Sequence, residues 1–200
     1  MQAIVFDCEI QREILTSQDQ ERMPGIEYCD GWQDFAHMGI SCVTAMDTGT
    51  GRPHVFLQDN LDEFSRLLRS RELSVGFNSQ TFDLPLLSAS GIRVEREKHF
   101  DIARAIWESA RIPPGVHPKG LGLDAICRRA GIQGKTGHGA EAPRWFQTGK
   151  IGRLVDYCLA DTYATATLYG LIMATGGVKD PRPAAEWTHA YGWLPVGLPL

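Results

Sequence analysis

The sequence lacks the cysteine and histidine patterns that mark disulfide frameworks and zinc sites. It has five cysteines, an odd count, and no two of them form a Cys-x-x-Cys pair. The six histidines show no His-x-x-x-His spacing, and neither a Gly-x-Ser-x-Gly motif nor a Cys/His nucleophile signature is present. We therefore expect buried or partly buried free thiols in a reducing cytosol and find no sign of a covalent hydrolase.

Long apolar runs and a surplus of basic residues are also missing. No run approaches the length of a membrane span, and no basic segment followed by a long apolar stretch opens the chain. We therefore expect a cytoplasmic protein with no membrane partner. The formal net charge of -4 lacks the basic footprint of most nucleic-acid binders. Carboxylates committed to cations and local clusters of basic residues keep that role open.

The order of the expected elements predicts one domain with an α/β fold. Two hundred residues suit a single core. Strands followed by interleaved helices indicate a mixed central sheet flanked by helices. Apolar runs and turn signals predict strands at 3–6, 38–47, 54–57 and 73–77, and helices near 61–68 and at 82–89, 121–130 and 151–174. The segment 100–107 is ambiguous between a strand end and a helix.

Two further segments are expected to be irregular. Residues 12–35 are polar, with turn signals at Pro24-Gly25 and Asp30-Gly31, and predict a long functional or covering loop. Its aromatic residues would stack on bases or cover the sheet, and covering is the interpretation we favour for Trp32. Residues 176–200 are expected to pack on the 1–175 domain as an irregular tail.

Asp7 and Glu9 follow the first apolar strand. Because strand side chains alternate, both carboxylates project from the same face. Two carboxylates at such a short distance repel each other unless a cation lies between them. Their hard oxygen ligands suit Mg²⁺ or Mn²⁺. A solvated acidic strand end is the alternative.

Asp83 and Asp161 lie in two other settings that suit a functional acid. Asp83 lies where a buried strand gives way to a helix, so helix capping is its alternative role. Asp161 and Tyr157 are four residues apart in a strong helical pattern and share one face. An acid beside the apolar residues of that helix, Cys158 among them, requires a partner, and a metal ion supplies one. A surface Asp with an interface Tyr is the alternative.

Together these motifs resemble those of a known family. Asp7-x-Glu9, Asn78-x-x-x-Phe82-Asp83 and Tyr157-x-x-x-Asp161 look like the motifs of the DEDD exonuclease superfamily, in its tyrosine-containing (DEDDy) branch. The resemblance is strongest to the proofreading domains of family B DNA polymerases and their stand-alone phage or bacterial relatives. It covers about residues 1 to 175. Asp156 occupies the position that the histidine variant of the family would need.

The resemblance implies a ribonuclease H-like fold and hydrolysis at the 3′ end, releasing nucleoside 5′-monophosphates. Two divalent cations, Mg²⁺ or Mn²⁺, would be held by Asp7, Glu9, Asp83 and Asp161. Tyr157 would position the attacking water or hydroxide. Two cations clamping the attacking and leaving oxygens fit an in-line displacement.

Substrate contacts are predicted around these motifs. Relatives often carry Thr or Ser after the first Glu, where this chain has Ile10. A basic loop at 134–139 would approach phosphates, although a surface loop without function is the alternative. The candidate substrate-binding residues are Cys8, Ile10, Asn78, Phe82, Lys135 and His138. Further candidates for phosphate contacts are Lys119, Arg144 and Lys150.

The function expected from these features is that of a 3′–5′ exonuclease on single-stranded ends, with DNA favoured over RNA. A ribonuclease D-like exoribonuclease is the alternative on the same chemistry, because nothing in the sequence reports on recognition of the 2′-hydroxyl. A non-catalytic nucleic-acid-binding module is the alternative from a different class. Proofreading would require a separate DNA polymerase as partner.

Overall fold

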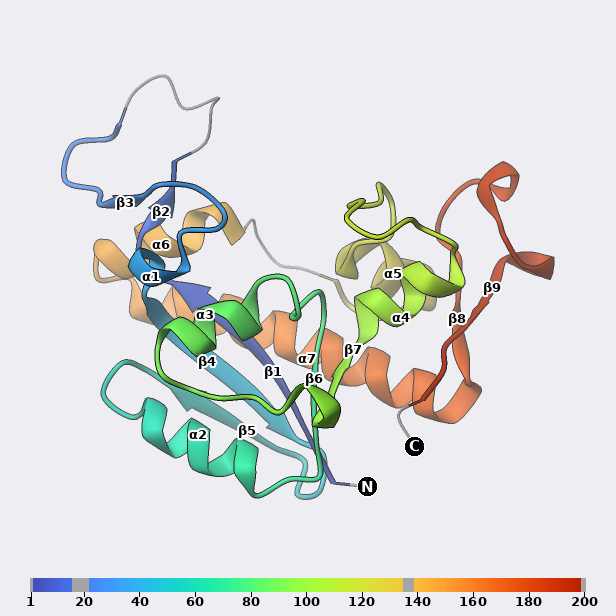
Figure 1. Ribbon diagram of the computed structural model, residues 1–200, viewed down its shortest axis with the longest axis horizontal. Coiled ribbons are helices and arrows are strands. Elements are labelled where there is room, and N and C mark those ends of the chain that lie inside the picture. The colour runs from blue at the N-terminus through green and yellow to red at the C-terminus, as the bar shows by residue number, and fades with distance from the viewer. Residues whose placement is uncertain (1, 16–21, 135–138, 199–200) are drawn as a thin grey trace.

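The computed structural model describes residues 2–15, 22–134 and 139–198 (Figure 1). Five strands form one mixed sheet in the order β5-β4-β1-β6-β7. Strand β4 pairs antiparallel with β1 and with β5, whereas β6 pairs parallel with β1 and with β7. The strands of this sheet are β1 (Ala3–Ile10), β4 (Ile40–Asp47), β5 (Arg52–Phe56), β6 (Leu73–Gly76) and β7 (His99–Asp101). The predicted α/β class with a mixed central sheet is confirmed.

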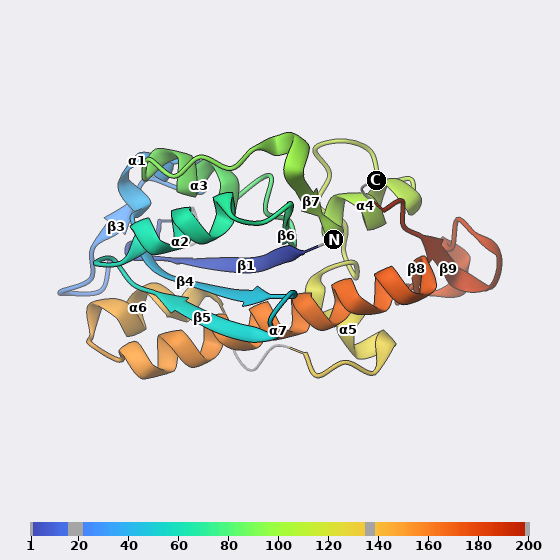
Figure 2. The same cartoon turned by 90° about the horizontal axis from the view of Figure 1, so that it is seen from below.

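Helices cover both faces of this sheet (Figure 2). One face carries α2 (Leu61–Arg69) and α3 (Asp83–Ala89), and the other carries α7 (Ile151–Thr175). A hydrophobic core lies on each face of the sheet, and successive side chains of β1 point alternately into one core and the other. On β1, Ile4 and Phe6 pack with α2 and α3, whereas Ala3 and Val5 pack in the cluster that includes α7. This alternation means that Asp7 and Glu9 project on the α7 side of the sheet.

Strand β1 is longer than predicted. The expected strand at 3–6 continues to Ile10 because β4 runs beside it and pairs with it as far as Ile40. Ladder hydrogen bonds come from the backbone, so the two acids do not interrupt the strand. A register shift lies between Glu9 and Ile10, immediately beside the acids. Such irregularities re-aim side chains next to functional sites.

The ambiguous segment 100–107 contains both a strand and a helix. Strand β7 ends at Asp101, whose side chain caps α4 (Ile102–Ser109) by accepting a hydrogen bond from the backbone N–H of Arg104 at 3.3 Å. The remaining helices are α1 (Phe35–Met38), α5 (Leu123–Ala130) and α6 (Ala142–Gln147), with 3-10 turns η1 (Arg96–Lys98), η2 (Gly139–Glu141), η3 (Ala184–Glu186) and η4 (Ala190–Gly192). The predicted C-terminal ends of α5 and α7 are confirmed, since Gly131 and Gly176 take the left-handed conformation after the last helical residue.

Three sequence expectations are corrected here. The tail is not irregular throughout, because β8 (Gly177–Lys179) and β9 (Trp193–Pro195) pair antiparallel and bury Val178 and Leu194 in the core. In the 12–35 segment, β2 (Glu13–Ile14) and β3 (Tyr28–Cys29) pair in parallel. Trp32 does not cover the sheet, since 63% of its surface is exposed.

Across the described ranges, no helix combines the length and the apolar character needed to cross a lipid bilayer.

Candidate active site

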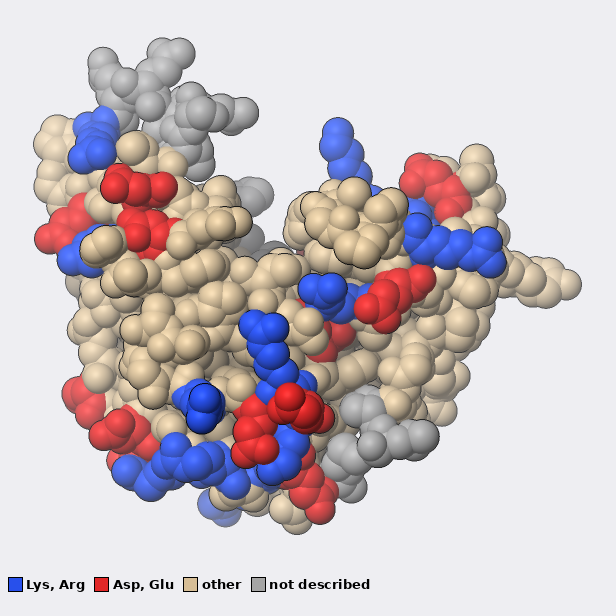
Figure 3. Space-filling view, viewed as in Figure 1, with Lys and Arg blue, Asp and Glu red and all other residues tan. Residues whose placement is uncertain are grey.

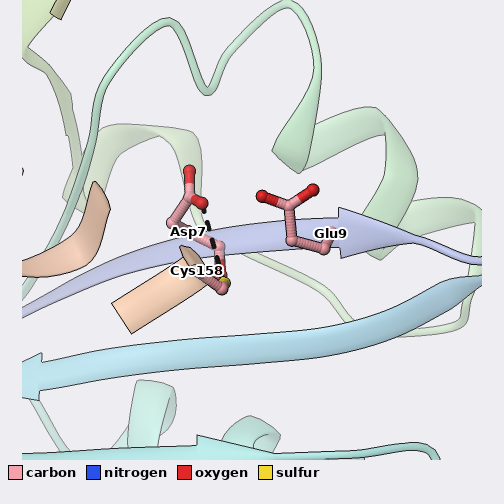
Figure 4. Close-up of side chains that lie close together, drawn as sticks. All are labelled: Asp7, Glu9 and Cys158. Atoms are coloured by element: carbon pink, nitrogen blue, oxygen red, sulfur yellow. Dashed lines mark hydrogen bonds between the residues drawn. The ribbon is translucent and has the colours of Figure 1, made fainter. Parts of the chain in front are cut away.

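Asp7 and Glu9 form the centre of an acidic cluster on β1 (Figure 4). Each offers a carboxylate oxygen, and Cys158 offers its sulfur, such that the three ligand atoms all lie within 4.8 Å of one another. The Cys158 thiol lies 3.7 Å from Asp7 Oδ2 and 3.5 Å from the Asp7 carbonyl oxygen. The predicted acidic pair therefore does converge, and the strand also brings it against α7.

Helix α7 is fixed against the sheet by polar contacts inside the core. Thr44 Oγ1 on β4 lies 2.6 Å from Thr162 Oγ1 and donates to Cys158 Sγ at 3.2 Å. These contacts set the rotation of the helix about its axis. Tyr157 and Asp161, each 3% exposed, are thereby brought to the same side as the β1 acids.

Tyr157 lies in a closely fitted environment. Its ring packs edge-on against Trp145, with 5.6 Å between the centroids. A Cβ atom at Gly139 would lie 3.2 Å from the Tyr157 hydroxyl oxygen. Glycine at this position therefore leaves the hydroxyl the room it occupies.

Asp83 reaches the cluster from α3 through the backbone of β1. Its Oδ1 accepts a hydrogen bond from the N–H of Cys8 at 3.0 Å. Pairing between β1 and β6 ends at Val5, so the aspartate bonds β1 beyond the end of that ladder. Burial raises the pKa of Asp83 to about 7, although the Cys8 N–H opposes that shift. Asp83 is the first residue of α3, where an acidic side chain suits the helix dipole, and its side chain also binds β1, so both predicted roles stay compatible with its position.

Asp101 holds the turn that leads into α3. Its Oδ1 accepts from the N–H of Asn78 and its Oδ2 from the N–H of Gln80, each at 2.9 Å. Asn78 has a positive φ of 59°, an uncommon backbone conformation for a residue other than glycine. At Gly76 the chain is so close to the turn that a Cβ would lie 2.5 Å from Ser79 Oγ. Asp101 thus stabilises an unusual backbone path directly before Asp83.

His99 also holds this turn, through a contact with Ser79. Its ring nitrogens lie 2.8 Å from Ser74 Oγ and 2.8 Å from Ser79 Oγ. Burial lowers the pKa of His99 to about 4, so the imidazole is neutral near pH 7. A neutral ring is able to donate through one nitrogen and accept through the other, which suits two hydroxyl partners.

We predict a pH-dependent contribution of His99 to stability. Between pH 6.5 and about 4 the unfolded chain binds a proton that the folded chain does not. The contribution is complete above pH 6.5 and is lost as the pH falls, by roughly 3 kcal/mol. The difference in free energy of unfolding between wild type and His99→Gln should shrink by about that amount. Urea unfolding at several pH values with a chelator measures it.

Comparing the two proteins removes the opposite effect of Asp83. The raised pKa of that carboxyl stabilises the folded state as the pH falls through about 7. Both proteins carry Asp83, so its effect cancels in the difference. A difference that is the same at pH 7 and pH 4 would contradict the assignment of a neutral, buried His99.

The predicted catalytic residues all line one cavity of about 1040 Å³. Figure 3 shows the surface hollowed between the part that carries β2, β3 and α1 and the part that carries α4 and α5. The predicted acids and the predicted tyrosine that line it are Asp7, Glu9, Asp83, Tyr157 and Asp161. Residues far apart in the sequence, from β1, α3 and α7, therefore meet at one site.

The predicted substrate contacts have different positions. Asn78 and Phe82 line the cavity. Cys8 and Ile10 border it but are 4% and 5% exposed and pack in the core beside α3, so a substrate contact by either stays a prediction. Lys135 and His138 lie outside the described residues. Of the phosphate candidates, Arg144 lines the cavity, whereas Lys119 and Lys150 are exposed elsewhere.

Several cavity residues were not predicted. Glu13 is buried and forms an ion pair with Arg144, and His117 reaches the cavity from the segment before α5. No sequence signal marks either of them. Cys158 does not line the cavity but lies 3.7 Å from Asp7 Oδ2, and it had a usable signal, because it lies three residues before Asp161 on the same helix and therefore shares its face.

The donor set fits a divalent cation held by oxygen. Burial raises the pKa of the Cys158 thiol well above its usual range, and Cys42, Asp7 and Glu9 raise it further. Thiolates rather than thiols bind metals, so Cys158 serves better as a neighbour of Asp7 than as a ligand. Carboxylate oxygens then remain as the donors, which suits hard cations.

The comparisons with known proteins agree with the fold. The chain matches the family model of the RNase_H superfamily over residues 54–173, and it belongs to that superfamily. The matched range contains Asp83, Tyr157 and Asp161. Together with the acidic cavity, this membership indicates a nuclease.

A solved structure shares the fold. It is that of the family B DNA polymerase from the hyperthermophilic archaeon Pyrobaculum calidifontis, with a TM-score of 0.58 and 16% sequence identity. The similarity covers 86% of this chain and 24% of the polymerase chain, so this protein spans about a quarter of that polymerase. No curated protein matches the chain.

Proposed function

We propose that this protein is a 3′–5′ exonuclease of the DEDDy branch that hydrolyses phosphodiester bonds at single-stranded ends, with DNA favoured over RNA. The observation that supports this most is the meeting of three distant acidic segments and Tyr157 in one cavity. Membership of the RNase_H superfamily and the fold shared with a family B DNA polymerase support the same proposal. A proofreading role would use a separate DNA polymerase as partner.

In this proposal the acids of the cavity and Tyr157 have different roles. Asp7, Glu9, Asp83 and Asp161 would hold two divalent cations, Mg²⁺ or Mn²⁺. Such cations, when bound, activate a water molecule and neutralise charge on the attacking and leaving oxygens. The Tyr157 hydroxyl orients the attacking water, and the hydrogen bond from Cys8 N–H holds the Asp83 carboxylate in place.

We expect an end-labelling assay to show stepwise shortening from the 3′ end. Wild type and Asp161→Asn are each given single-stranded DNA and RNA labelled at the 5′ or the 3′ end, with Mn²⁺ or with chelator. Wild type should release nucleoside 5′-monophosphates with Mn²⁺, and the variant should be slower by at least about 100-fold, because it loses a charge that no other group replaces.

The four substrate arms separate the alternatives. Faster hydrolysis of RNA would replace DNA as the preferred substrate and support the ribonuclease D-like alternative. Shortening from the 5′ end, or equal rates for both folded proteins, would contradict the proposal. Tight binding of the strands without any hydrolysis would instead favour a non-catalytic binding module.

A further inference from the structure

Trp32 is an exposed aromatic side chain at the edge of the acidic cavity. It is 63% exposed and yet lines the same cavity as Asp7 and Asp161. A single exposed hydrophobic side chain is ordinary on a protein surface. Its place in the lining of a site that also holds the candidate catalytic acids is what requires an explanation.

The turn that carries Trp32 is braced on both sides. Asp34 Oδ2 accepts from the N–H of Asp30 at 2.9 Å, and the N–H of Asp34 donates to the carbonyl of Gly31 at 3.2 Å. Asp34 Oδ1 also lies 2.6 Å from His37 Nδ1. The indole therefore projects from a turn with fixed ends, so little backbone conformational entropy is lost when a ligand binds against it.

Two other aromatic rings extend the surface toward the acids. Phe82 lies edge-on to Trp32, with 6.1 Å between the ring centroids, and to Phe35, with 6.0 Å. All three rings line the cavity. Phe82 directly precedes Asp83 in the chain, so this aromatic wall ends at the candidate catalytic cluster.

Charge in the cavity favours an aromatic contribution to strand binding. Asp7, Glu9, Glu13, Asp83 and Asp161 line it, and among the described lining residues Arg144 is the one Arg or Lys. That arginine is paired with Glu13, its Nε lying 2.6 Å from Oε2. The described residues of the cavity therefore offer a nucleic acid strand little basic surface, and a contact that does not depend on charge gains importance.

We propose that Trp32, with Phe82 beside it, stacks on a nucleobase near the 3′ end of an unpaired substrate strand. This inference rests on the proposed nuclease function and identifies what selects the substrate, because the face of a base becomes available to the indole when its neighbour unstacks, which costs less in an unpaired strand than in a duplex. Aromatic stacking is tolerant of sequence, since every base has a π-face. Trp32 therefore favours single strands over duplexes without choosing among bases.

The test pairs a protein change with a substrate change. Binding of a fluorescein-labelled single-stranded DNA is measured by anisotropy with Mn²⁺ in an Asp161→Asn background, with Trp32 or with Trp32→Ala. The strand carries either all its bases or one abasic position, moved stepwise inward from the 3′ end. Trp32→Ala should weaken binding of the intact strand between about 5- and 150-fold. Trp32→Phe should weaken it much less.

One abasic position should weaken binding to the Trp32 protein but have no further effect on the Trp32→Ala protein. Tyr191→Ala serves as the matched control, because Tyr191 is 95% exposed and is not a lining residue of the cavity. Equal affinities of the Trp32 and Trp32→Ala proteins, or additive losses at every abasic position, would overturn the stacking role.

The result is separable from the proposed function. Hydrolysis by wild type, combined with a Trp32→Ala protein of unchanged affinity, removes the stacking role alone. A wild type that hydrolyses no strand removes the exonuclease, while the binding cycle still reports whether Trp32 stacks on a base.

Discussion

Asp7→Asn should reduce the rate of hydrolysis by about 1000-fold or more while leaving the fold intact. Asp7 lies at the centre of the cluster, close to Glu9 and next to the buried thiol of Cys158. The substitution keeps the size of the side chain and removes the negative charge that holds a cation. A metal ion contributes several kcal/mol to the stabilisation of transition-state charge, which corresponds to about three or more powers of ten in rate.

The stability of Asp7→Asn should not fall with its activity. With chelator present, removing one of several clustered carboxylates relieves repulsion, so the free energy of unfolding should be equal to that of wild type or higher. Mn²⁺ should raise the unfolding midpoint of wild type because it binds the folded state, and this increase should be much smaller for Asp7→Asn. Thermal unfolding followed by circular dichroism, with and without Mn²⁺, gives both quantities.

Asp59→Asn is the matched control for Asp7→Asn. Asp59 is exposed in the turn before α2 and is not a lining residue of the cavity. It should keep the wild-type rate and the wild-type response to Mn²⁺. Wild-type activity in Asp7→Asn would show that the chemistry does not use this cluster.

Asp101→Asn should lower both stability and activity. One carboxylate oxygen would be replaced by an amide NH₂, which cannot accept a hydrogen bond from the N–H of Asn78 or of Gln80. Hydrogen bonds to a charged acceptor are worth about 1.5–3 kcal/mol, and a buried N–H left without a partner costs a similar amount. We expect the free energy of unfolding to fall by about 2–4 kcal/mol, measured by urea unfolding.

Activity should fall with stability because the turn held by Asp101 positions Asp83. Once the turn relaxes, the Asp83 carboxylate is no longer fixed against the N–H of Cys8. Loss of such a supporting contact typically costs about 10- to 100-fold. The loss should appear mainly in kcat and in the Mn²⁺ concentration needed for half-maximal rate, with a smaller change in KM for the strand.

Glu95→Gln provides the comparison for Asp101→Asn. Glu95 is exposed and forms a surface ion pair with Lys98 at 2.8 Å. Pairs of this kind contribute about 1 kcal/mol or less, so stability and rate should stay close to wild type. Wild-type kcat in a folded but destabilised Asp101→Asn protein would limit Asp101 to a purely structural role.

The sequence alone determined one strand, one helix face and two helix ends of this protein, because these features depend on neighbouring residues only. An apolar run followed by Asp7 and Glu9 predicts a strand with two acids on one face, and that depends only on the alternation of side chains. Tyr157 and Asp161 share a helix face because of their spacing. The ends of α5 and α7 followed from glycines that take the left-handed conformation more readily than other residues.

Other features were decided by contacts between segments that are distant in the sequence. Strand β1 runs on through its acids because β4 lies beside it, and the tail gains β8 and β9 because each supplies the other's backbone partners. Asp83 appeared suited to cap a helix, yet its carboxylate binds the N–H of Cys8 on another element. No local sequence pattern indicates which backbone N–H of β1 is available to donate to such a side chain from another element.

The composition of the cavity beyond the predicted acids and Tyr157 likewise depended on the tertiary structure. Glu13, His117 and Trp32 come from segments without periodicity, so their side chains have no direction that spacing is able to predict. Packing of α7 on β1 places the Cys158 thiol against Asp7, and folding of the 30–34 turn leaves Trp32 exposed beside Phe82. The sequence determined which residues are the candidates for the chemistry, whereas the tertiary structure decided what surrounds them, because that depends on packing between distant elements.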